Sequence, residues 1–359
     1  MRIATLGNAA VGHTTTWVSW FRSRGHDVRL FSLQAPPEGF ADCVRLPSSS
    51  LPGALRYPLA VPALMRELER FGPDVVDAHY LPNYGLMGAL AGRQPLSIAA
   101  WGSDLLLAAR SNGFQYVRAR FALRRARLVL CDARNLARAA LQAGAIPETV
   151  WALPWGIDLT RFVPAAERTP GLIVSTRMHE AIYDLTTVIA AAAHVLAERP
   201  HTTLVVAGHG SQRGALERLA AERLPAGRWR FTGRLEPAAM AELLGRAEVV
   251  LSASHSDSTS QSLLETMASG AIPVVSDLEG NREWVGEGDG ARLFPIGDAR
   301  ACASAVLRVL DDPAWAAMAR ARNRAVVVER GDASRNMARI EDAFARLAAG
   351  RPLGEGARA

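Results

Sequence analysis

The fold class follows from one stretch, Ser256-Asp257-Ser258-Thr259-Ser260-Gln261-Ser262-Leu263-Leu264-Glu265. An apolar run, Val249-Val250-Leu251, precedes it and is typical of a buried strand. The second half of the stretch predicts a short helix with its apolar positions on one side, and Gly270 ends that helix. Ser258 and Gln261 have the spacing of a capping box, so we expect the helix to begin directly at this turn.

A helix that begins at the carboxyl end of a parallel strand is a ready site for an anion, above all for phosphate. Two acids flank this helix start. Asp257 stands just before it, and Glu265 lies eight residues later, which is about 12 Å along a helix axis. A phosphate between two carboxylates that can accept hydrogen bonds from hydroxyl groups is typical of a nucleotide-sugar pocket.

Length and composition place the chain among globular enzymes. Its 359 residues exceed one typical core and predict two domains. We expect neither a transmembrane segment nor a signal peptide, because no apolar run reaches membrane-spanning length and the chain starts with strand-like residues. Three scattered cysteines favour neither a disulfide framework nor a zinc site. These features predict a cytoplasmic protein.

The net charge of +6 is carried by arginine alone, since the chain has no lysine. A phosphate group must therefore be bound by arginine, by histidine or by backbone amides. The basic residues are spread without interleaved aromatic residues, which argues against nucleic-acid binding. One arginine-rich stretch is either a solvated helix face or a basic amphipathic helix on the inner face of a membrane. It contains Arg118, Arg120, Arg124, Arg125 and Arg127.

Strand-like runs alternate with helical patterns, which predicts α/β architecture with parallel sheets. Two doubly wound halves joined near 160–170 are the simplest arrangement, with a loop at 34–57 in the first half. We expect domains at 1–163 and 164–330, then a C-terminal helical segment, 331–359, that packs back on the first domain and ends in a frayed tail. The expected strands are 2–6, 28–32, 74–78, 96–100, 128–131, 149–153, 172–176, 203–207, 229–232, 248–252, 272–276 and 291–294.

Polar residues at expected strand ends are candidate ligand-binding groups, because open α/β sheets bind ligands at the carboxyl ends of their strands. Each has a structural alternative: a tight turn, a hydrogen-bonded core histidine or a solvated arginine. In the first half the candidates are Gly12, His13, His79, Tyr80, Trp101 and Asp104. In the second half they are Arg177, Tyr183, Gly208, Gly210 and Arg234.

Taken together, these motifs resemble the family-4-type retaining glycosyltransferases of the GT-B fold, over nearly the whole chain. The most specific part is 247–285, which looks like that family's E-x7-E region followed by a strand similar to its G-x-PVV motif, here Gly270-Ala271-Ile272-Pro273-Val274-Val275. Supporting matches are Gly25-His26-Asp27-Val28, Trp155-Gly156-Ile157-Asp158 and Gly208-His209-Gly210. The resemblance implies two Rossmann-like domains that face a central cleft.

The resemblance also implies residue roles. Glu265 would accept hydrogen bonds from the ribose, Asp257 would hold the donor sugar, and Arg177 would neutralise the leaving diphosphate. The sugar would be transferred with retention of configuration, without a metal or another cofactor. Further donor-binding candidates are Gly12, Tyr183, Gly208, Gly210, Arg234, Ser258, Thr259, Ser260, Gln261, Leu263 and Leu264. Acceptor-side candidates are His13, His79, Tyr80, Trp101 and Asp104.

The sequence departs from the family pattern in the donor region and in the first half. Asp257 stands where glutamate is usual, and Ser258-Thr259-Ser260 replaces Gly-Phe-Gly. Tyr183 occupies the position of a lysine that often helps to bind phosphate. A histidine common at the end of the fourth strand is absent, with Trp101 in that region. These departures leave the donor sugar open.

Two other functions stay open at this stage. The chain could be a sugar-nucleotide-binding protein that has lost catalysis, or a sugar-nucleotide epimerase on the same fold. The nucleotide, UDP, GDP or another, is not determined by the motifs. The acceptor could be a carbohydrate, a lipid-linked intermediate or a small natural product.

Overall fold

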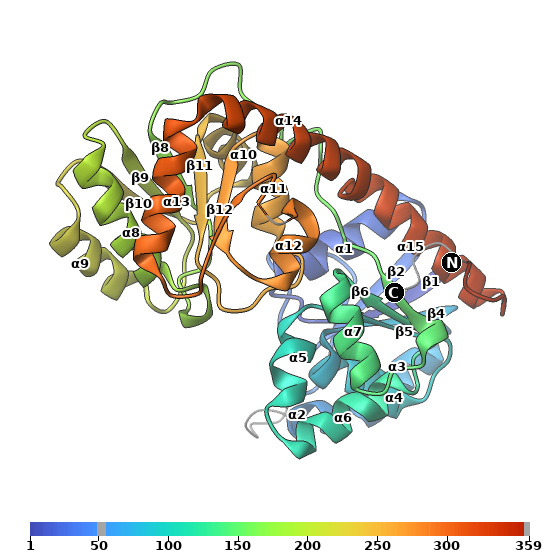
Figure 1. Cartoon of the computed structure of the whole chain (residues 1–359). Coiled ribbons are helices and arrows are strands. Elements are labelled where there is room, and N and C mark those ends of the chain that lie inside the picture. The colour runs from blue at the N-terminus through green and yellow to red at the C-terminus, as the bar shows by residue number, and fades with distance from the viewer. Residues whose placement is uncertain (49–54, 287, 355–359) are drawn as a thin grey trace. The chain divides into compact units, whose positions relative to one another are not determined.

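The computed structural model describes residues 1–48, 55–286 and 288–354, and it divides into two compact units (Figure 1). Unit 1 comprises Met1–Leu153 and the segment from Met337 onward, and unit 2 comprises Pro154–Asn336. The sequence placed the corresponding boundaries at 163/164 and 330/331. The last five residues of the predicted frayed tail, 355–359, lie outside the described residues.

Unit 1 is built on a seven-stranded parallel sheet with the order β3-β2-β1-β4-β5-β6-β7. The strands are β1 (Arg2–Leu6), β2 (Asp27–Ser32), β3 (Cys43–Arg45), β4 (Val75–His79), β5 (Leu96–Ala100), β6 (Leu128–Cys131) and β7 (Val150–Ala152). The helices are α1 (Gly12–Ser23), α2 (Arg56–Leu59), α3 (Val61–Phe71), α4 (Leu86–Ala91), α5 (Ser103–Leu106), α6 (Gly113–Leu123) and α7 (Arg134–Gln142).

Two features of unit 1 were not expected from the sequence. Strand β3 lies inside the stretch expected to be a loop, where Cys43 pairs with Leu30 of β2; residues 49–54 of that stretch lie outside the described residues. A π-helical turn, η2 (Tyr80–Gly85), follows β4. Helix α15 (Ala333–Ala348) belongs to this unit from Met337 onward, and Phe344 stacks on Phe21 with the ring centres 5.3 Å apart.

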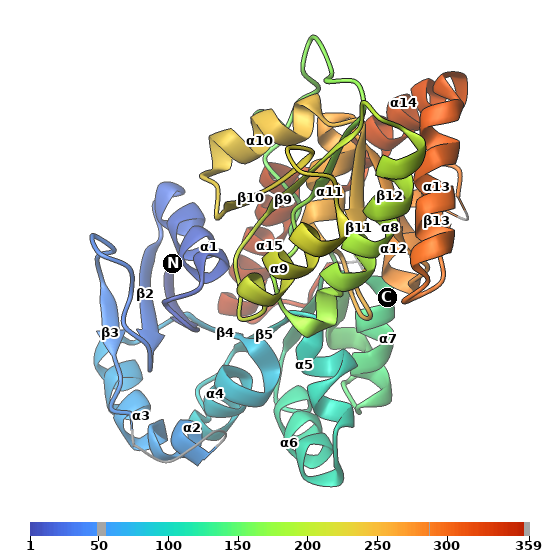
Figure 2. The ribbon, with the colours of Figure 1, turned by 90° about the vertical axis from the view of Figure 1, so that its left-hand side faces the viewer.

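Unit 2 contains a six-stranded parallel sheet with the order β10-β9-β8-β11-β12-β13 (Figure 2). Its strands are β8 (Leu172–Ser175), β9 (Thr203–Ala207), β10 (Trp229–Gly233), β11 (Val249–Ser252), β12 (Ile272–Ser276) and β13 (Arg292–Phe294). The helices are α8 (Leu185–Glu198), α9 (Arg213–Arg223), α10 (Pro237–Arg246), α11 (Gln261–Ser269), α12 (Glu279–Val285), α13 (Ala299–Asp311) and α14 (Pro313–Arg330).

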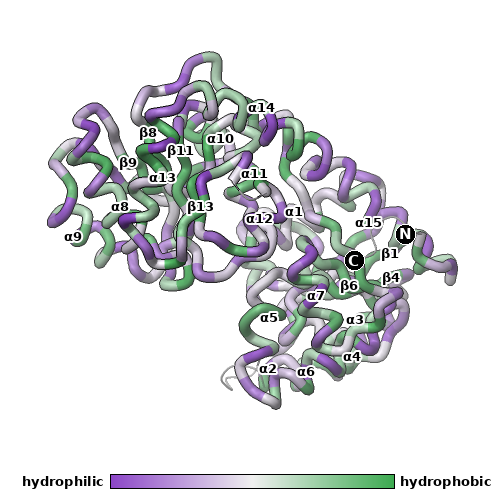
Figure 3. Tube along the Cα trace, viewed as in Figure 1, coloured by the Kyte–Doolittle hydropathy of each residue, from purple (hydrophilic) through white to green (hydrophobic). Residues whose placement is uncertain are grey.

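The core of unit 2 has two layers because successive strand residues point to opposite faces of the sheet. Ile173 and Leu251 pack with α8, α9 and α13, whereas Val174 and Val250 pack with α10, α11 and α12. Both faces of these strands are therefore apolar, as expected for parallel sheets covered on both sides. Figure 3 shows these strands as hydrophobic segments.

One helical segment, Ala181–Glu198, is apolar and long enough to cross a membrane by length and composition alone. The expectation that no run reaches this length was therefore wrong. The segment includes α8, whose side chains Leu185, Val188 and Ile189 are buried in the core of unit 2. These contacts are those of a core helix, which satisfies the same length and hydropathy test.

Candidate functional site

Arg177 is the centre of a side-chain cluster at the carboxyl ends of two paired strands, β8 and β11. Its guanidinium is buried and pairs through Nη2 with Oδ2 of Asp257 at 2.8 Å. Nη1 donates to the hydroxyl oxygens of Ser262, at 2.9 Å, and of Ser260. The ring of Tyr183 lies 4.2 Å from the guanidinium carbon. We call Arg177, Tyr183, Asp257, Ser260 and Ser262 the Arg177 cluster.

The start of α11 adds backbone donors to this cluster. Ser260 is the N-cap residue, and its side chain makes no capping hydrogen bond, so the predicted capping box between Ser258 and Gln261 was wrong. The hydroxyl of Ser260 accepts from Arg177 instead. Within the described residues, the amides of Gln261 and Ser262 have no backbone acceptor. Free amides at a helix start favour an anion.

Two of the predicted donor-binding residues take part in packing. The side chains of Leu263 and Leu264 are buried in the core between α11 and the sheet. Their amides both bond to the carbonyl oxygen of Ser260, at 3.0 and 3.2 Å. Neither residue can therefore offer a free group to a ligand, and their contribution is to fix the position of α11.

Helix α12 supports the loop that carries Asp257. A Cβ atom at Gly280 would lie 2.2 Å from the carbonyl oxygen of Ser258 and 2.8 Å from that of Asp257. The indole Nε1 of Trp284 donates to Oγ1 of Thr259 at 3.1 Å. Gly280 and Trp284 were not predicted as site residues, because their contacts depend on how α12 packs.

A glycine loop after β9 packs behind Arg177. A Cβ atom at Gly208 would lie 2.6 Å from the carbonyl oxygen of Arg177, and one at Gly210 would lie 2.5 Å from that of His179. His179 is fully buried against this loop, and neither of its ring nitrogens has a hydrogen-bond partner among the described residues. Burial lowers the pKa of His179, so the ring is neutral near pH 7. These predicted glycines position the Arg177 segment by close backbone approach.

Glu265 is on α11, one turn further into the helix than Ser262. Burial raises the pKa of Glu265 from its usual 4.5 to about 7, while the positive charges of Arg177 and Arg161 oppose this rise. A carboxyl group with a pKa near neutrality is half ionised at pH 7 and gains by accepting hydrogen bonds from a ligand.

Two predicted donor-binding residues lie outside this cluster. Arg234 follows β10 with an exposed side chain, and it makes no hydrogen bond or ion pair with the Arg177 cluster in the part of unit 2 that the structure describes. Gly12 belongs to unit 1, where it is the first residue of α1. Among the described residues, no three histidine, cysteine, aspartate or glutamate side chains are grouped to hold a metal ion.

Unit 1 has its own cavity, of about 450 Å³, at the carboxyl ends of β1 and β4. The predicted residues His79, Tyr80 and Trp101 line it. His13 does not line it, but its ring packs on Trp101 at 5.5 Å between centres. The sequence did not indicate the rest of the lining: Asn8, Val11, Thr14, Gln34, Arg56, Tyr57, Asn83 and Tyr84.

The turn η2 explains why Asn83 and Tyr84 were missed. Tyr80 has φ +70°, which is uncommon for a residue with a side chain. The π-helical turn then directs Tyr80, Asn83 and Tyr84 to the same cavity, a spacing that neither a strand nor an α-helix pattern predicts. Both π-helical turns and residues with positive φ are frequent at functional sites.

Asp77 and His79 form a buried pair at one side of this cavity. Nε2 of His79 and Oδ2 of Asp77 are 2.9 Å apart, and the indole of Trp17 donates to the same oxygen at 2.9 Å. Asp104 was predicted on the acceptor side, but it is fully buried and does not line the cavity. Its carboxylate accepts from the amides of Leu81 and Trp101, so it holds the backbone around the cavity.

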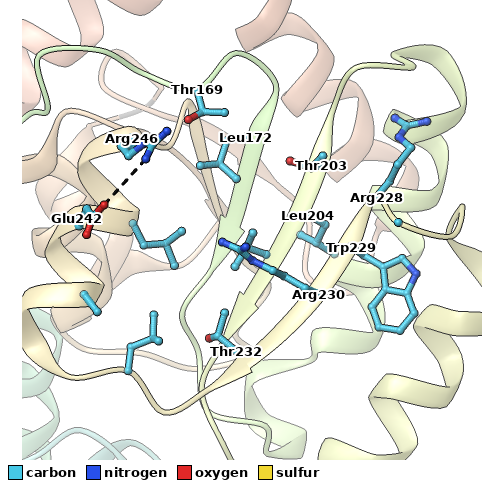
Figure 4. A pocket seen from close by; sticks show the side chains of 15 residues that line it. Thr169, Leu172, Thr203, Leu204, Arg228, Trp229, Arg230, Thr232, Glu242 and Arg246 are labelled. Carbon is cyan, nitrogen blue, oxygen red and sulfur yellow. Dashed lines mark ion pairs between the residues drawn. The ribbon is translucent and has the colours of Figure 1, made fainter.

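A cavity of unit 2 lies elsewhere (Figure 4). It measures about 560 Å³ and is lined by α10 and by residues at the amino ends of β8, β9 and β10, such as Leu172, Thr203 and Trp229. Glu242 and Arg246, 3.9 Å apart, lie on its α10 side. Since the Arg177 cluster follows the carboxyl ends of β8 and β11, this cavity is separate from it.

Comparison with known proteins identifies the family. Residues 2–133 match the model of the 4-like glycosyl transferases, and residues 169–312 match that of the group 1 glycosyl transferases. Phosphatidyl-myo-inositol mannosyltransferase of Mycolicibacterium smegmatis is 26% identical over 329 residues, which cover 84% of this chain and 80% of that protein. A GDP-mannose-dependent alpha-mannosyltransferase of the same species is 29% identical over 291 residues, which cover 75% and 76%.

Solved structures confirm the expected fold. Sucrose-phosphate synthase from Thermosynechococcus elongatus superposes with a TM-score of 0.85 at 18% identity, covering 98% of this chain and all of that one. Anabaena HepE in complex with UDP-glucose gives a TM-score of 0.80 at 17% identity, covering 97% and 100%. The two parallel α/β sheets are those of the GT-B fold, and the chain belongs to the family-4-like, group 1 glycosyltransferases.

Proposed function

We propose that the protein transfers a sugar, with retention of configuration, from a nucleoside diphosphate-sugar bound at the Arg177 cluster. The observation that carries this proposal is the pairing of Arg177 with Asp257 and two serine hydroxyls beside the free amides of α11. This arrangement offers a fixed cation and helix-start amides to a leaving diphosphate. It supplies that charge stabilisation from protein groups alone, so we propose that no metal is required.

Two acids, Asp257 within the cluster and Glu265 on α11, are available to contact the other parts of the donor. We propose that Glu265 accepts hydrogen bonds from the ribose and that Asp257 accepts them from the sugar while it holds Arg177. Two of the relatives support a nucleotide-sugar donor, since one is named for GDP-mannose and another was solved with UDP-glucose. The donor could therefore carry either nucleotide.

The cavity in unit 1 is the proposed acceptor site. Its walls combine four aromatic side chains with amide groups and the guanidinium of Arg56. Aromatic faces pack on the apolar side of a sugar ring, and amides bond to its hydroxyl groups. A ring that carries hydroxyl groups therefore fits this lining, whether it belongs to a carbohydrate, a lipid-linked intermediate or a small natural product.

We propose that the protein works in the cytoplasm. The three cysteines Cys43, Cys131 and Cys302 are free, and two of them are buried. Free cysteines are ordinary in a reducing compartment. Fractionation of cells that express the full chain tests this: recovery only in an oxidising compartment would contradict it.

A transfer assay with the purified protein tests the proposed reaction. UDP-glucose and GDP-mannose are incubated with a panel of hydroxylated acceptors, and the anomeric configuration of each product is read by NMR. Arg177→Ala is expected to lower kcat/KM by at least ~100-fold. A matched control, Glu242→Ala, alters an exposed acid of α10 and is expected to leave activity unchanged.

Other outcomes select other functions. Nucleotide binding without turnover over the whole panel would favour a binding protein. An isomerised sugar released without an acceptor would favour an epimerase. An inverted product would contradict the retaining mechanism, and full activity of Arg177→Ala would contradict the assignment of the donor site.

A further inference from the structure

Charge is strongly one-sided in the part of unit 1 that includes α4, α5 and α6. Residues 78–131 contain seven arginines and a single acid, Asp104, which is fully buried. Six of these arginines are exposed: Arg93, Arg110, Arg120, Arg124, Arg125 and Arg127. Arg118 is the exception, since it is buried and donates to the carbonyl oxygen of Pro82 at 2.7 Å. Every exposed charged side chain within residues 78–131 is therefore positive.

Apolar side chains are exposed in the same region. Of the fifteen large apolar side chains that are exposed among the described residues, five lie within residues 78–131: Leu90, Leu107, Phe114, Tyr116 and Val117. The two with the greatest exposure there, Phe114 and Val117, are both 63% exposed and lie three residues apart on α6. Residues at this spacing share one face of a helix. Two apolar side chains that are exposed side by side make this part of α6 a candidate contact for an apolar partner.

The outer side of α6 combines both properties. Arg120 and Arg124 follow Val117 at intervals of three and seven residues, and the guanidinium of Arg125 lies 3.8 Å from the ring centre of Phe121. Ala119, Ala122 and Leu123 form the opposite, buried side. We call the exposed set Phe114, Val117, Arg120 and Arg124 the α6 face. It has apolar side chains flanked by cations, and neither Arg120 nor Arg124 forms an ion pair within the described residues.

From this juxtaposition we infer that the α6 face docks on an anionic lipid surface. Phe114 and Val117 enter the boundary between headgroups and acyl chains, and Arg120 and Arg124 contact lipid phosphates. A second copy of the chain is a poorer occupant, because a two-fold interface would bring two acid-free basic surfaces together. A nucleic acid is also poorer: its bases could stack on Phe114, but the equally exposed aliphatic Val117 offers no ring for stacking.

The neighbouring helices extend the surface towards the unit 1 cavity. Helix α4 contacts both α6 and α2, and the two views place α2 and α6 at the same end of unit 1 (Figures 1 and 2). Helix α2 exposes Leu59 and contributes Arg56 and Tyr57 to the cavity lining. A membrane bound at α6 would therefore lie near the helix that borders the proposed acceptor site.

Vesicle flotation with the full-length protein tests the inference. Vesicles of phosphatidylcholine alone are compared with vesicles that contain about one third phosphatidylglycerol. We expect binding at least ~10-fold tighter to the anionic vesicles, and weaker binding as salt is added. Equal binding to both vesicles, or no binding to either, would overturn the inference.

Matched variants locate the contact. Phe114→Ser with Val117→Ser is expected to weaken vesicle binding about tenfold, whereas Met318→Ser with Val328→Ser alters exposed apolar residues of α14 and should leave it unchanged. Arg120→Gln with Arg124→Gln should remove the preference for anionic lipid, and Arg223→Gln with Arg300→Gln should not. Circular dichroism verifies that each variant is folded.

Two further measurements separate other occupants of the face. A change from dimer to monomer in the α6 variants, seen by light scattering without vesicles, would assign the face to a second copy. Binding of a labelled oligonucleotide that these variants abolish would assign it to nucleic acid. Either result overturns the lipid assignment. Donor hydrolysis in solution does not depend on vesicles, so failure of vesicle binding is distinguishable from failure of the proposed transferase activity.

Discussion

The guanidinium carbon of Arg177 lies 4.2 Å from the centre of the Tyr183 ring. Tyr183 stands where the family resemblance leads one to expect a second cation, and the structure assigns it a different task. Its ring packs on the one arginine of the cluster, which the Asp257 carboxylate and two serine hydroxyls also hold. The cluster thus contains one cation, Arg177, and these contacts hold its guanidinium in place.

This packing predicts that the ring of Tyr183 matters more than its hydroxyl. Tyr183→Ala removes a cation–π contact of about 0.5–2 kcal/mol and should lower kcat/KM roughly 2- to 30-fold. Tyr183→Phe keeps the ring and should stay within about twofold of the wild type. Steady-state kinetics with donor varied measures both. Equal losses in the two variants would instead show that the hydroxyl contacts the donor.

Glu265 should make stability and nucleotide binding depend on pH. Its pKa in the folded protein is about 7, above the usual 4.5, so the folded state holds this proton more tightly than the unfolded state. The free energy of unfolding should therefore fall as pH rises from about 4.5 to 7. Glu265→Gln removes that loss and should stabilise the protein by about 1–3 kcal/mol at pH 8 but not at pH 4.5.

Ionisation of Glu265 should have opposite effects on stability and on nucleotide binding. If ionised Glu265 accepts hydrogen bonds from the ribose, nucleoside diphosphate should bind more tightly at pH 8 than at pH 6, and Glu265→Gln should weaken it about tenfold. Calorimetric titration with a 2′,3′-dideoxy nucleotide is the control, since its binding should change little with pH or with the substitution. A pH-independent affinity of the wild type for the ordinary nucleotide would remove Glu265 from the ribose site.

A side chain at position 280 should disturb the loop that carries Asp257, because no room is left for a Cβ atom there. An alanine Cβ would lie 2.2 Å from the carbonyl oxygen of Ser258, so the Asp257–Ser258 backbone or α12 must move. Gly280→Ala is expected to cost about 1–3 kcal/mol of stability and to lower kcat/KM for donor. Gly214→Ala on α9 meets only the side chain of Arg218 at 3.7 Å and should be neutral or slightly stabilising. Wild-type kinetics in Gly280→Ala would show that the loop tolerates displacement.

Much of the proposed donor site was predictable from strand ends. Arg177 and Asp257 follow two apolar runs that form the paired strands β8 and β11, and parallel strands bring their carboxyl ends together. The local pattern could not show that Ser260 and not Ser258 is the N-cap residue of α11, because the Ser260 hydroxyl bonds to Arg177 and not to the helix. Tertiary contact, and not capping chemistry, selects that boundary.

The cavity of unit 1 was less predictable. His79, Tyr80 and Trp101 follow strands directly and were found for that reason, whereas Tyr84 and Asn83 depend on a π-helical turn. Arg56 and Tyr57 come from a short helix in a stretch that composition marked as a loop. Asp104 shows the opposite error: its position after a strand suggested ligand binding, but its carboxylate is occupied by backbone amides.

Asp77 should position His79 at the acceptor cavity. Its Oδ2 atom lies 2.9 Å from both Nε2 of His79 and the indole nitrogen of Trp17, so Asp77→Ala leaves two buried groups without this partner. We expect a loss of about 1–3 kcal/mol in stability and a raised KM for acceptor, while donor hydrolysis, which depends on unit 2, changes little. Ser97→Ala on the neighbouring strand β5 is a matched control, since that buried hydroxyl has no hydrogen-bond partner among the described residues. Asp77→Asn keeps the shape and one acceptor oxygen, so it should recover part of the stability and of the acceptor KM. An unchanged acceptor KM in stably folded Asp77→Ala would show that this pair serves packing alone.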